Sequence, residues 1–446
     1  MNYKYPEGHV FYRNLHLDYP LIVRGQGVYL YDEEGKKYLD GCGGAAVVNI
    51  GHGVEDVARA IAGQAAKAAY VSGLQFTHQP VEELAEGIAR FLPFKQGKTL
   101  FLTSGSEAVE AAVKLARQFW MEKGKGKKFR MISRRPSYHG NTLAALSLSA
   151  REHYKEVFRP MLSESIKIPA PYCYRCAWGE EYPGCGVRCA HALEEAVLEH
   201  GEENISAFIF EVIGGATTGA AVPPAEYFEV VRKIREKFDI LLIADEIMTG
   251  FGRTGRWLAS DHFGLCPDII VMGKGITGGY VPLSCVSAKK EIADTIHAQG
   301  RSLLHAQTFA QHPVACAAGA ATLEYIREHQ LVEKSAAMGR LLKDALEPLR
   351  SHPQVGDIRG QGLFAGVEFV ADKKTKTPFP RSRKYAERLV SCSMEKGLLL
   401  WPNVGQADDT NGDLVLVAPP FTITPEEIQR VSEILRNVLL EMSATA

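Results

Sequence analysis

The chain has 446 residues, enough for a large domain with a substantial core and a second, smaller domain. Its 51 basic and 52 acidic residues give a formal net charge of −1, so neither a nucleic acid nor an anionic membrane is indicated as a partner. The N-terminal eight residues contain no apolar signal segment, and no apolar run reaches transmembrane length. We therefore expect a cytoplasmic protein, whose nine cysteines are reduced thiols rather than a disulfide framework.

The N-terminal residues predict a β-hairpin followed by a glycine-rich segment. Two partly apolar stretches within residues 27–40 flank Asp-Glu-Glu-Gly at 32–35, which is typical of a turn. Residues 41–52 are too rich in glycine for a stable helix. Such a backbone can approach a ligand or a second chain closely.

From about residue 100 the chain alternates between short apolar runs and helical patterns. The strand-like runs are at 100–102, 129–132, 206–210, 240–244 and 269–272, and the helical patterns include 106–121, 191–200 and 225–237. This alternation predicts an α/β fold with a doubly wound, mostly parallel sheet.

The pattern changes after Tyr325. Charged amphipathic helices at 330–350, 383–396 and 425–442 are interspersed with short strands near 362–370 and 413–418. These elements predict a smaller α+β domain. We therefore assign residues 71–325 to a large domain and 326–446 to the small domain, to which residues 1–70 also contribute.

Charged side chains follow two of the apolar runs. Asp245 and Glu246 come directly after residues 240–244, and Lys274 follows the run at 268–272. Because ligands bind beyond the carboxyl ends of parallel strands, Asp245 and Lys274 are expected in one crevice. A lysine at a strand end is commonly a surface residue. Beside a buried acid, however, it is suited to a Schiff base with a carbonyl cofactor, and an aspartate is the usual partner of a pyridinium nitrogen.

Residues 100–107 read Leu-Phe-Leu-Thr-Ser-Gly-Ser-Glu, a strand that turns directly into a helix. Ser104 and Glu107 have the spacing of a capping box. A helix entered through Ser-Gly-Ser leaves free backbone N–H groups that suit an anion such as phosphate, although capping alone would also explain the pattern. ATP is disfavoured, because the residues around Lys274 do not fit the Walker spacing.

Two further positions carry ambiguous signals. Tyr138, in the sequence Tyr-His-Gly, could stack on a flat heteroaromatic ring or simply form part of a turn. Glu211 ends an apolar run as Asp245 does, and carboxylates at successive strand ends indicate a polar site more than packing.

Four cysteines form a compact motif between two βα units. Cys173, Cys176, Cys185 and Cys189 have the spacing C-x2-C-x8-C-x3-C. This spacing could fold around a structural zinc ion, or the residues could remain reduced or partly paired thiols. The motif includes no acid of catalytic type, so we assign no metal to the catalytic site.

Several of these segments, taken in order, resemble the class III aminotransferases, which are pyridoxal-phosphate enzymes of fold type I. The resemblance covers nearly the whole chain and is greatest for the omega-amine, taurine-pyruvate-like branch. The matching segments are Phe101–Ala108, Tyr138–Gly140, Leu242–Gly255, Pro267–Gly275 and Gln307–Pro313.

The resemblance implies a role for each matching residue. Lys274 would form the Schiff base with pyridoxal 5′-phosphate and move the substrate proton, and Asp245 would keep the pyridinium nitrogen protonated. Tyr138 would stack on one ring face and Ile247 would pack on the other. Thr308 would reach the phosphate of a neighbouring subunit, giving a homodimer or a dimer of dimers. The implied cofactor-binding set is Gly105, Ser106, Tyr138, His139, Glu211, Asp245, Ile247, Lys274 and Thr308, and the catalytic set is Lys274, Asp245 and Tyr138.

The implied reaction moves an amino group from a primary amine or omega-amino acid to a keto acid such as pyruvate, by a ping-pong mechanism. Aminomutases, amino-acid racemases and decarboxylases share the same central motifs and stay open as alternatives. Two departures bear on the substrate. Residues 399–413 contain no arginine, which many relatives use to hold a carboxylate, and Ala45–Ala46 stand where some relatives have a bulky aromatic, which predicts a wider pocket.

Overall fold

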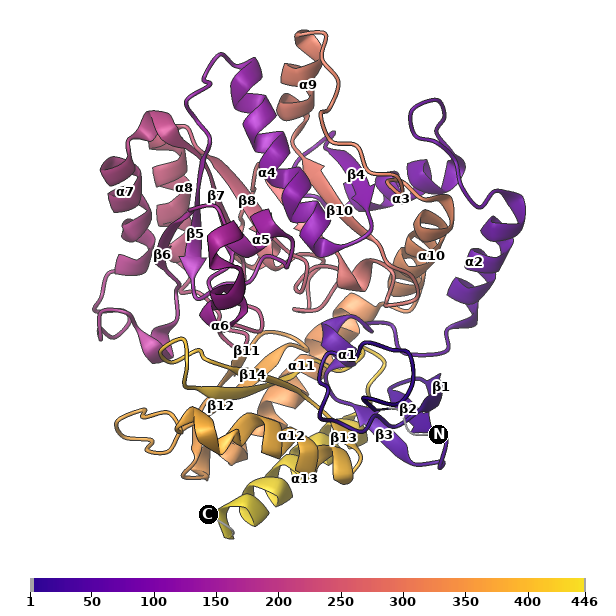
Figure 1. The fold of residues 1–446 in the computed structure, drawn as a ribbon, viewed down its shortest axis with the longest axis vertical. Coiled ribbons are helices and arrows are strands. Elements are labelled where there is room, and N and C mark those ends of the chain that lie inside the picture. Colours follow the sequence, from indigo (N-terminus) through magenta and orange to yellow (C-terminus); the bar gives the residue numbers. More distant parts are fainter. Residues whose placement is uncertain (1–3, 445–446) are drawn as a thin grey trace.

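The structure is a computed structural model that describes residues 4–444, and its main feature is a seven-stranded sheet in the upper half of Figure 1. In spatial order the strands are β4 (Lys98–Leu102), β10 (Ser284–Ala288), β9 (Ile269–Met272), β8 (Leu241–Asp245), β7 (Ile205–Glu211), β5 (Arg130–Arg135) and β6 (Ile166–Pro169). Strand β10 runs antiparallel to β4 and β9, and the other neighbouring pairs are parallel. The prediction of a mostly parallel sheet is therefore confirmed, although β6 and β10 were not predicted.

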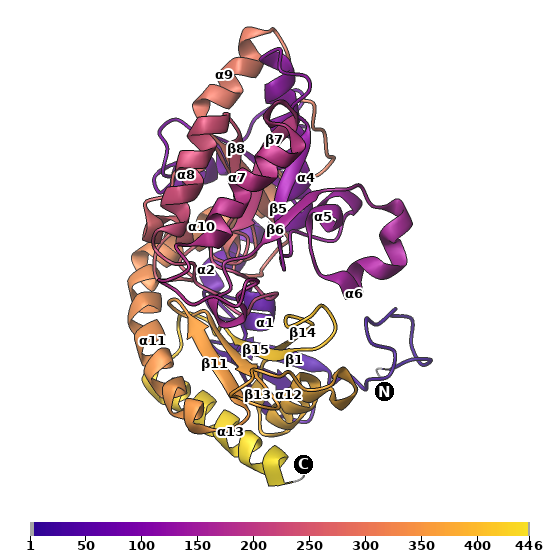
Figure 2. The same ribbon diagram turned by 90° about the vertical axis from the view of Figure 1, so that its left-hand side faces the viewer.

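Helices cover both faces of this sheet, as a doubly wound fold requires. The first face packs on α4 (Gly105–Glu122) and receives Ala207 and Ile209 of β7, whereas Phe208 and Phe210 join the core on the other face. Figure 2 shows α4 and α5 on one side of the sheet and α8 and α10 on the other. The bounds of the further helices are α5 (Leu143–Leu148), α6 (Glu152–Lys155), α7 (Arg188–His200), α8 (Tyr227–Phe238), α9 (Lys290–Ala298) and α10 (Pro313–Glu328).

The N-terminal part supplies a hairpin and two surface helices. Strands β2 (Tyr29–Asp32) and β3 (Lys37–Asp40) pair antiparallel, as predicted. The glycine-rich segment contains a single short helix, α1 (Gly43–Ala46), within which Gly44 and Ala45 have non-helical backbone angles. Helices α2 (Glu55–Lys67) and α3 (Gln79–Ala89) then pack against α10.

The lower half of Figure 1 is built from two four-stranded sheets and three helices. One sheet has the order β1 (Ile22–Gln26), β2, β3 and β13 (Leu398–Leu399), and the other has β11 (Val355–Gly360), β12 (Ala365–Phe369), β15 (Asp413–Val417) and β14 (Trp401–Val404). The helices are α11 (Leu331–Leu346), α12 (Tyr385–Glu395) and α13 (Pro425–Ala444). The parallel pairing of β3 with β13 joins an N-terminal strand to a C-terminal one.

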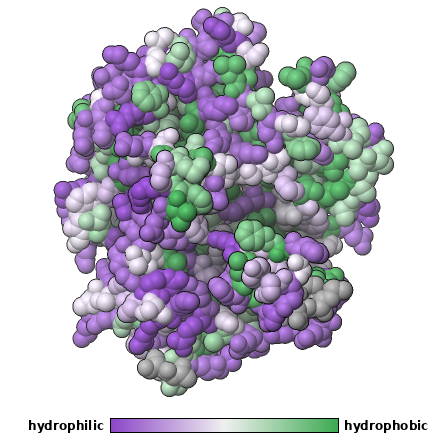
Figure 3. Space-filling model, in the orientation of Figure 1, coloured by the Kyte–Doolittle hydropathy of each residue, from purple (hydrophilic) through white to green (hydrophobic). Residues whose placement is uncertain are grey.

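The molecular face in Figure 3 is hollowed between these two halves. Hydrophobic side chains gather on the right of this view, over α2 and the loop that follows it. No helix within residues 4–444 is long and apolar enough to cross a membrane.

Candidate active site

A cavity of about 200 Å³ lies beyond the carboxyl ends of β7, β8 and β9. It is lined by eight of the nine residues expected at the cofactor site, namely Gly105, Ser106, Tyr138, His139, Glu211, Asp245, Ile247 and Lys274. The ninth, Thr308, is exposed and does not line the cavity of its own chain. The sheet thus gathers residues that are up to 169 positions apart in the sequence (274 − 105).

Asp245 is fixed at the floor of the cavity by two contacts. Its side chain is 5% exposed, the Oδ2 atom lies 2.7 Å from Nδ1 of His139, and the Oδ1 atom accepts a hydrogen bond of 3.1 Å from the Ile247 N–H. The backbone N–H of His139 donates a 2.8 Å hydrogen bond to the Ser149 hydroxyl, which holds the residue in place. A carboxylate has about four acceptor positions, so Asp245 retains capacity for a protonated ring nitrogen.

Lys274 enters the cavity from a strained backbone position. Its φ of +45° lies in the left-handed region, which costs a non-glycine residue about 1–3 kcal/mol and is seen most often at functional sites. Burial lowers the pKa of Lys274 to about 8, against the opposing effect of the Asp245 and Glu211 charges. The Nζ atom also lies 5.8 Å from the ring centroid of Trp401. A lysine in this state is a competent base and nucleophile near neutral pH.

The opposite end of the cavity is the N-terminus of α4. The predicted capping box is present: the Ser104 hydroxyl accepts from the Glu107 N–H at 3.3 Å, and Glu107 Oε2 accepts from the Ser104 N–H at 3.1 Å. The first-turn N–H groups of Gly105 and Ser106 have no partner within the helix, which makes this end an anion site. A side chain at position 105 would meet Ile247 at 2.9 Å, so glycine keeps the cavity open here.

Glu211 organises the wall between these two ends. Its Oε1 atom accepts from the Gly215 N–H at 3.0 Å, and its Oε2 atom accepts from the Tyr138 N–H at 3.3 Å. Burial raises the pKa of Glu211, a rise that His139 opposes and Asp245 reinforces. Glu211 therefore orients the Tyr138 backbone as well as contributing a polar surface.

Some residues in and around the cavity were not among the expected site residues. Ile213, Met248 and Thr249 line the cavity, and Trp401 reaches toward Lys274 from the C-terminal half. Arg253 is fully buried nearby and donates to the carbonyl oxygens of Leu363 and Pro419 at 3.0 and 2.6 Å. Met248, Thr249 and Arg253 lie within the matching segment Leu242–Gly255, whereas Ile213 and Trp401 lie outside the matching segments.

The two alanines expected to widen the pocket differ in their surroundings. Ala46 is 2% exposed and has a φ of +57°, so a tryptophan placed there would be both crowded and strained. Ala45 is half-buried with a negative φ of −121°. To test the width of the pocket, a larger side chain should therefore be introduced at Ala45 rather than at Ala46.

The four cysteines of the sequence motif border one small cavity of about 20 Å³. Within residues 4–444 all nine cysteines are free thiols, and no group of three or more His, Cys, Asp or Glu side chains there is placed to hold a metal ion. Burial raises the pKa of Cys189 to about 12, which keeps that thiol protonated.

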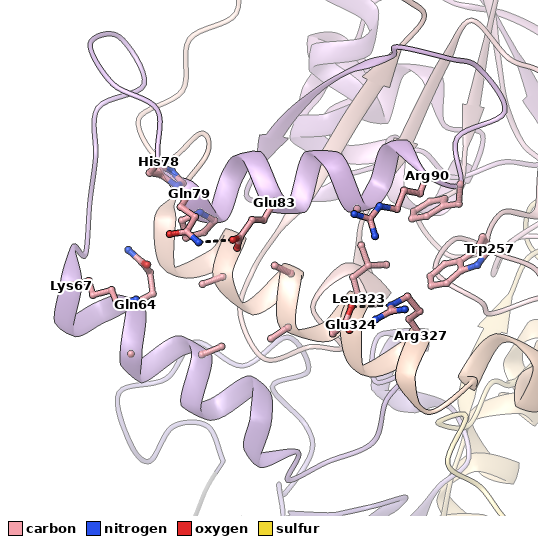
Figure 4. A pocket seen from close by; sticks show the side chains of 18 of the residues that line it. Gln64, Lys67, His78, Gln79, Glu83, Arg90, Trp257, Leu323, Glu324 and Arg327 are labelled. Carbon is pink, nitrogen blue, oxygen red and sulfur yellow. Dashed lines mark hydrogen bonds and ion pairs between the residues drawn. The ribbon is translucent and has the colours of Figure 1, made fainter.

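A larger cavity, of about 1000 Å³, lies between α2, α3 and α10 (Figure 4). It contains none of the expected site residues. Its lining includes a hydrogen bond of 2.6 Å from Gln79 to Glu83 and an ion pair between Arg327 and Glu324. We therefore place the chemistry in the smaller cavity at the strand ends.

Comparisons with known proteins identify the family of the chain. The family model "Aminotransferase class-III" matches residues 12–439, and the chain belongs to this family. Members of the family depend on pyridoxal phosphate, so the protein is a pyridoxal-phosphate-dependent aminotransferase of fold type I.

Two relatives and one solved structure are similar to the chain over most of its length. The chain is 38% identical over 422 residues to an uncharacterised aminotransferase of Bacillus subtilis (strain 168), covering 94% of this chain and 95% of that protein. It is 35% identical over 426 residues to the putrescine–pyruvate aminotransferase of Pseudomonas aeruginosa, covering 95% and 91%. A thermostable (S)-enantioselective omega-transaminase from Thermomicrobium roseum has a TM-score of 0.90 and 36% identity, covering 97% of this chain and 95% of that chain.

The lowered pKa of Lys274 predicts how the apoprotein takes up pyridoxal phosphate. Only the neutral amine reacts with an aldehyde, so with a pKa of about 8 the uptake rate should rise about 50-fold between pH 6 and pH 8 and level off above about pH 9. Stopped-flow absorbance of the apoprotein mixed with the cofactor measures this rate. A rate that keeps rising tenfold per pH unit to pH 10 would contradict the prediction.

Proposed function

We propose that this enzyme transfers an amino group from a primary amine or omega-amino acid to a keto acid such as pyruvate, in two alternating half-reactions. The observation that carries the proposal is the convergence of Lys274, Asp245 and the N-terminus of α4 on one cavity. The activity named for the Pseudomonas relative and the omega-transaminase titles of solved neighbours support this donor and acceptor class. The absence of arginine from residues 399–413 also favours donors without a carboxylate.

In this proposal each residue has a defined task. When bound, pyridoxal phosphate supplies an electron sink that acidifies the substrate C–H next to nitrogen. The backbone N–H of Gly105, together with the backbone N–H and hydroxyl of Ser106, binds the phosphate. Tyr138 and Ile247 confine the ring from opposite sides. Asp245 holds the ring nitrogen protonated, and the Lys274 amine accepts the substrate proton at Nζ and returns it to the adjacent position.

The test is the visible absorption of the purified holoenzyme during single half-reactions. Bleaching of the long-wavelength cofactor band by carboxylate-free amines, and its return when pyruvate is added, would establish the proposed transfer. Release of a carbonyl product in step with bleaching separates transamination from the mutase and racemase alternatives. Persistence of the band with every amine tested would overturn the donor assignment.

The surface around Thr308 supports a homodimer in which this residue serves the neighbouring subunit. Tyr70 donates from its hydroxyl to the Thr308 carbonyl oxygen at 3.1 Å, and its ring contacts Phe309. Leu74, which is 89% exposed, and Phe76 lie in the same loop as Tyr70. Exposed apolar side chains gathered in this way mark an interaction surface.

Subunit hybrids test this arrangement directly. Thr308→Glu and Lys274→Ala should each be inactive alone, since the first repels the phosphate and the second removes the base. In a randomly mixed dimer one site combines the intact Lys274 of one subunit with the intact Thr308 of the other, so about a quarter of wild-type activity should return. If Thr308 instead serves its own subunit, every hybrid site carries one defect and no activity returns.

A further inference from the structure

Arg151, between α5 and α6, is a buried cation without an anionic partner. It is 9% exposed, its guanidinium carbon lies 4.4 Å from the ring centroid of Tyr154, and its Nε atom is buried without a hydrogen-bond partner. No carboxylate within residues 4–444 forms an ion pair with it. Burial lowers the pKa of Arg151, although a guanidinium remains charged in proteins. An unpaired buried charge is costly, so folds retain one chiefly where a ligand completes it.

The other buried arginines have structural partners. Arg134 donates to the Glu211 carbonyl oxygen, and Arg253 donates to two carbonyl oxygens. Arg359, in the small-domain half, pairs with Asp357 at 2.9 Å and with Glu368 at 2.7 Å. Arg151 differs from all three because only an aromatic ring supports its guanidinium.

Arg151 lies next to the wall of the active-site cavity. Tyr154, on which its guanidinium stacks, contacts Tyr138 edge-on with ring centroids 6.3 Å apart. Tyr138 lines the cavity, and burial raises its pKa while the nearby Arg151 charge opposes that rise. The unpaired cation is therefore one aromatic ring away from the proposed ring-stacking residue.

The Glu211 charge opposes the lowering of the Arg151 pKa, but no carboxylate within residues 4–444 forms an ion pair with Arg151. Glu152 pairs with Arg159 at 2.7 Å, and Asp409 pairs with Arg135. Burial and the Arg151 charge lower the pKa of His153 to about 4, so this histidine is neutral at pH 7. Arg13 donates to the Tyr154 hydroxyl at 2.7 Å and adds further positive charge.

Arg151 also lies opposite the C-terminal segment in which many relatives have a carboxylate-binding arginine and this chain has none. A Cβ atom added at Gly405, in the loop after β14, would lie 3.4 Å from Nδ1 of His153, and Figure 2 shows this loop opposite α6. The loop belongs to residues 399–413, which contain no arginine. A cation is thus present on the facing wall of the cleft rather than in this loop.

We propose that Arg151 is a carboxylate-binding residue of the active site, which receives the carboxylate of the keto-acid acceptor and of any amino-acid donor. This inference rests on the proposed function. A guanidinium fork binds a carboxylate through two parallel N–H···O bonds, and exclusion of water strengthens them. Donors that lack a carboxylate make no use of Arg151, so one cavity accepts simple amines and keto acids in turn.

The experiment replaces Arg151 by Gln and measures the two half-reactions separately. For Arg151→Gln the KM for pyruvate should rise about 10- to 100-fold, which is the loss expected for a charge-assisted bidentate pair, while bleaching by a carboxylate-free amine should change less than about threefold. Arg151→Lys keeps the positive charge but not the two parallel N–H donors, so its KM for pyruvate should lie between those of the wild type and Arg151→Gln. Arg135→Gln is the matched control: this cation already pairs with Asp409, so its loss should leave the KM for pyruvate within about threefold.

An equilibrium readout separates the outcomes. Titration calorimetry of the holoenzyme with propanoate, an inert carboxylate, should show binding to the wild type and to Arg135→Gln but about tenfold weaker binding to Arg151→Gln. Equal propanoate binding by the wild type, Arg135→Gln and Arg151→Gln would overturn the role of Arg151. So would an Arg151→Gln variant that is impaired equally in the amine and the pyruvate half-reactions. If no amine bleaches the wild type, the proposed function fails, yet the propanoate comparison still decides Arg151.

Discussion

Replacing Lys274 by Ala should lower kcat by about 10⁴-fold or more, because both the covalent attachment and the base that moves the substrate proton are lost. Steady-state rates with an amine and pyruvate measure this change. The cofactor should still bind through the N-terminus of α4, so the loss should fall on kcat more than on cofactor affinity.

A control distinguishes this effect from a general loss of lysine. Lys290→Ala removes an exposed lysine of α9 that pairs only with Asp294 one helical turn away, and it should change kcat by less than about twofold. Retention of more than about a tenth of wild-type kcat by Lys274→Ala would rule out the assigned role.

The same variant also makes a stability prediction. The pKa of Lys274 is about 8 in the folded apoprotein and near its ordinary 10.5 when unfolded, so burying this charge costs stability in full below pH 8. The cost fades between pH 8 and 10.5. Lys274→Ala apoprotein should therefore be at least as resistant to urea as the wild type at pH 7, which also verifies that its inactivity does not come from misfolding.

Replacing Asp245 by Asn should lower kcat by about 10²- to 10³-fold. An ionised carboxylate raises the pKa of an adjacent pyridinium nitrogen by about 1–3 units, and asparagine cannot supply this charge. The amide can still contact His139 Nδ1 and accept from the Ile247 N–H, the two contacts that now hold the carboxylate, so the fold should be retained. Pre-steady-state bleaching with an amine should report the slower proton removal.

The adjacent acid provides the matched control. Glu246 is fully buried, but its oxygens accept from the N–H and hydroxyl of Ser260 at 2.8 and 2.7 Å, and it does not line the cavity. Glu246→Gln should cost about 1–3 kcal/mol of unfolding free energy through disturbed hydrogen bonds. Its kcat per folded molecule should stay within about tenfold of the wild type. A larger loss for Glu246→Gln than for Asp245→Asn would invert the two assignments.

The contrast between Asp245 and Glu246 illustrates how far sequence reasoning reaches. Both follow one apolar run, and the sequence predicts Asp245, not Glu246, in the crevice with Lys274. Successive residues of a strand point to opposite faces, and the structure shows Asp245 toward the cavity and Glu246 toward Ser260.

Contacts between segments far apart in the chain could not be predicted from the sequence. Trp401 and Arg253 reach the neighbourhood of Lys274 through the packing of the small half against the large one. Strand β10 reads Ser-Cys-Val-Ser-Ala, a short run that carries no clear alternation, and its place between β4 and β9 depends on pairing with strands far away in the chain. Arg151 belongs to no motif, and only the folded chain shows that its buried guanidinium is supported by the Tyr154 ring without a carboxylate partner among the described residues.

The sequence by itself determined the alternating βα pattern, the capping box before α4, the acid and the lysine at strand ends, and through these the family. Each of these features depends on residues within a few positions of one another, where periodicity, capping and strand-end chemistry act directly. Only the tertiary structure decided which further residues line the cavity, what the adjacent acid Glu246 contacts and that Arg151 has no carboxylate partner within residues 4–444. These depend on burial and on contacts between segments as much as 169 residues apart, which no local pattern records.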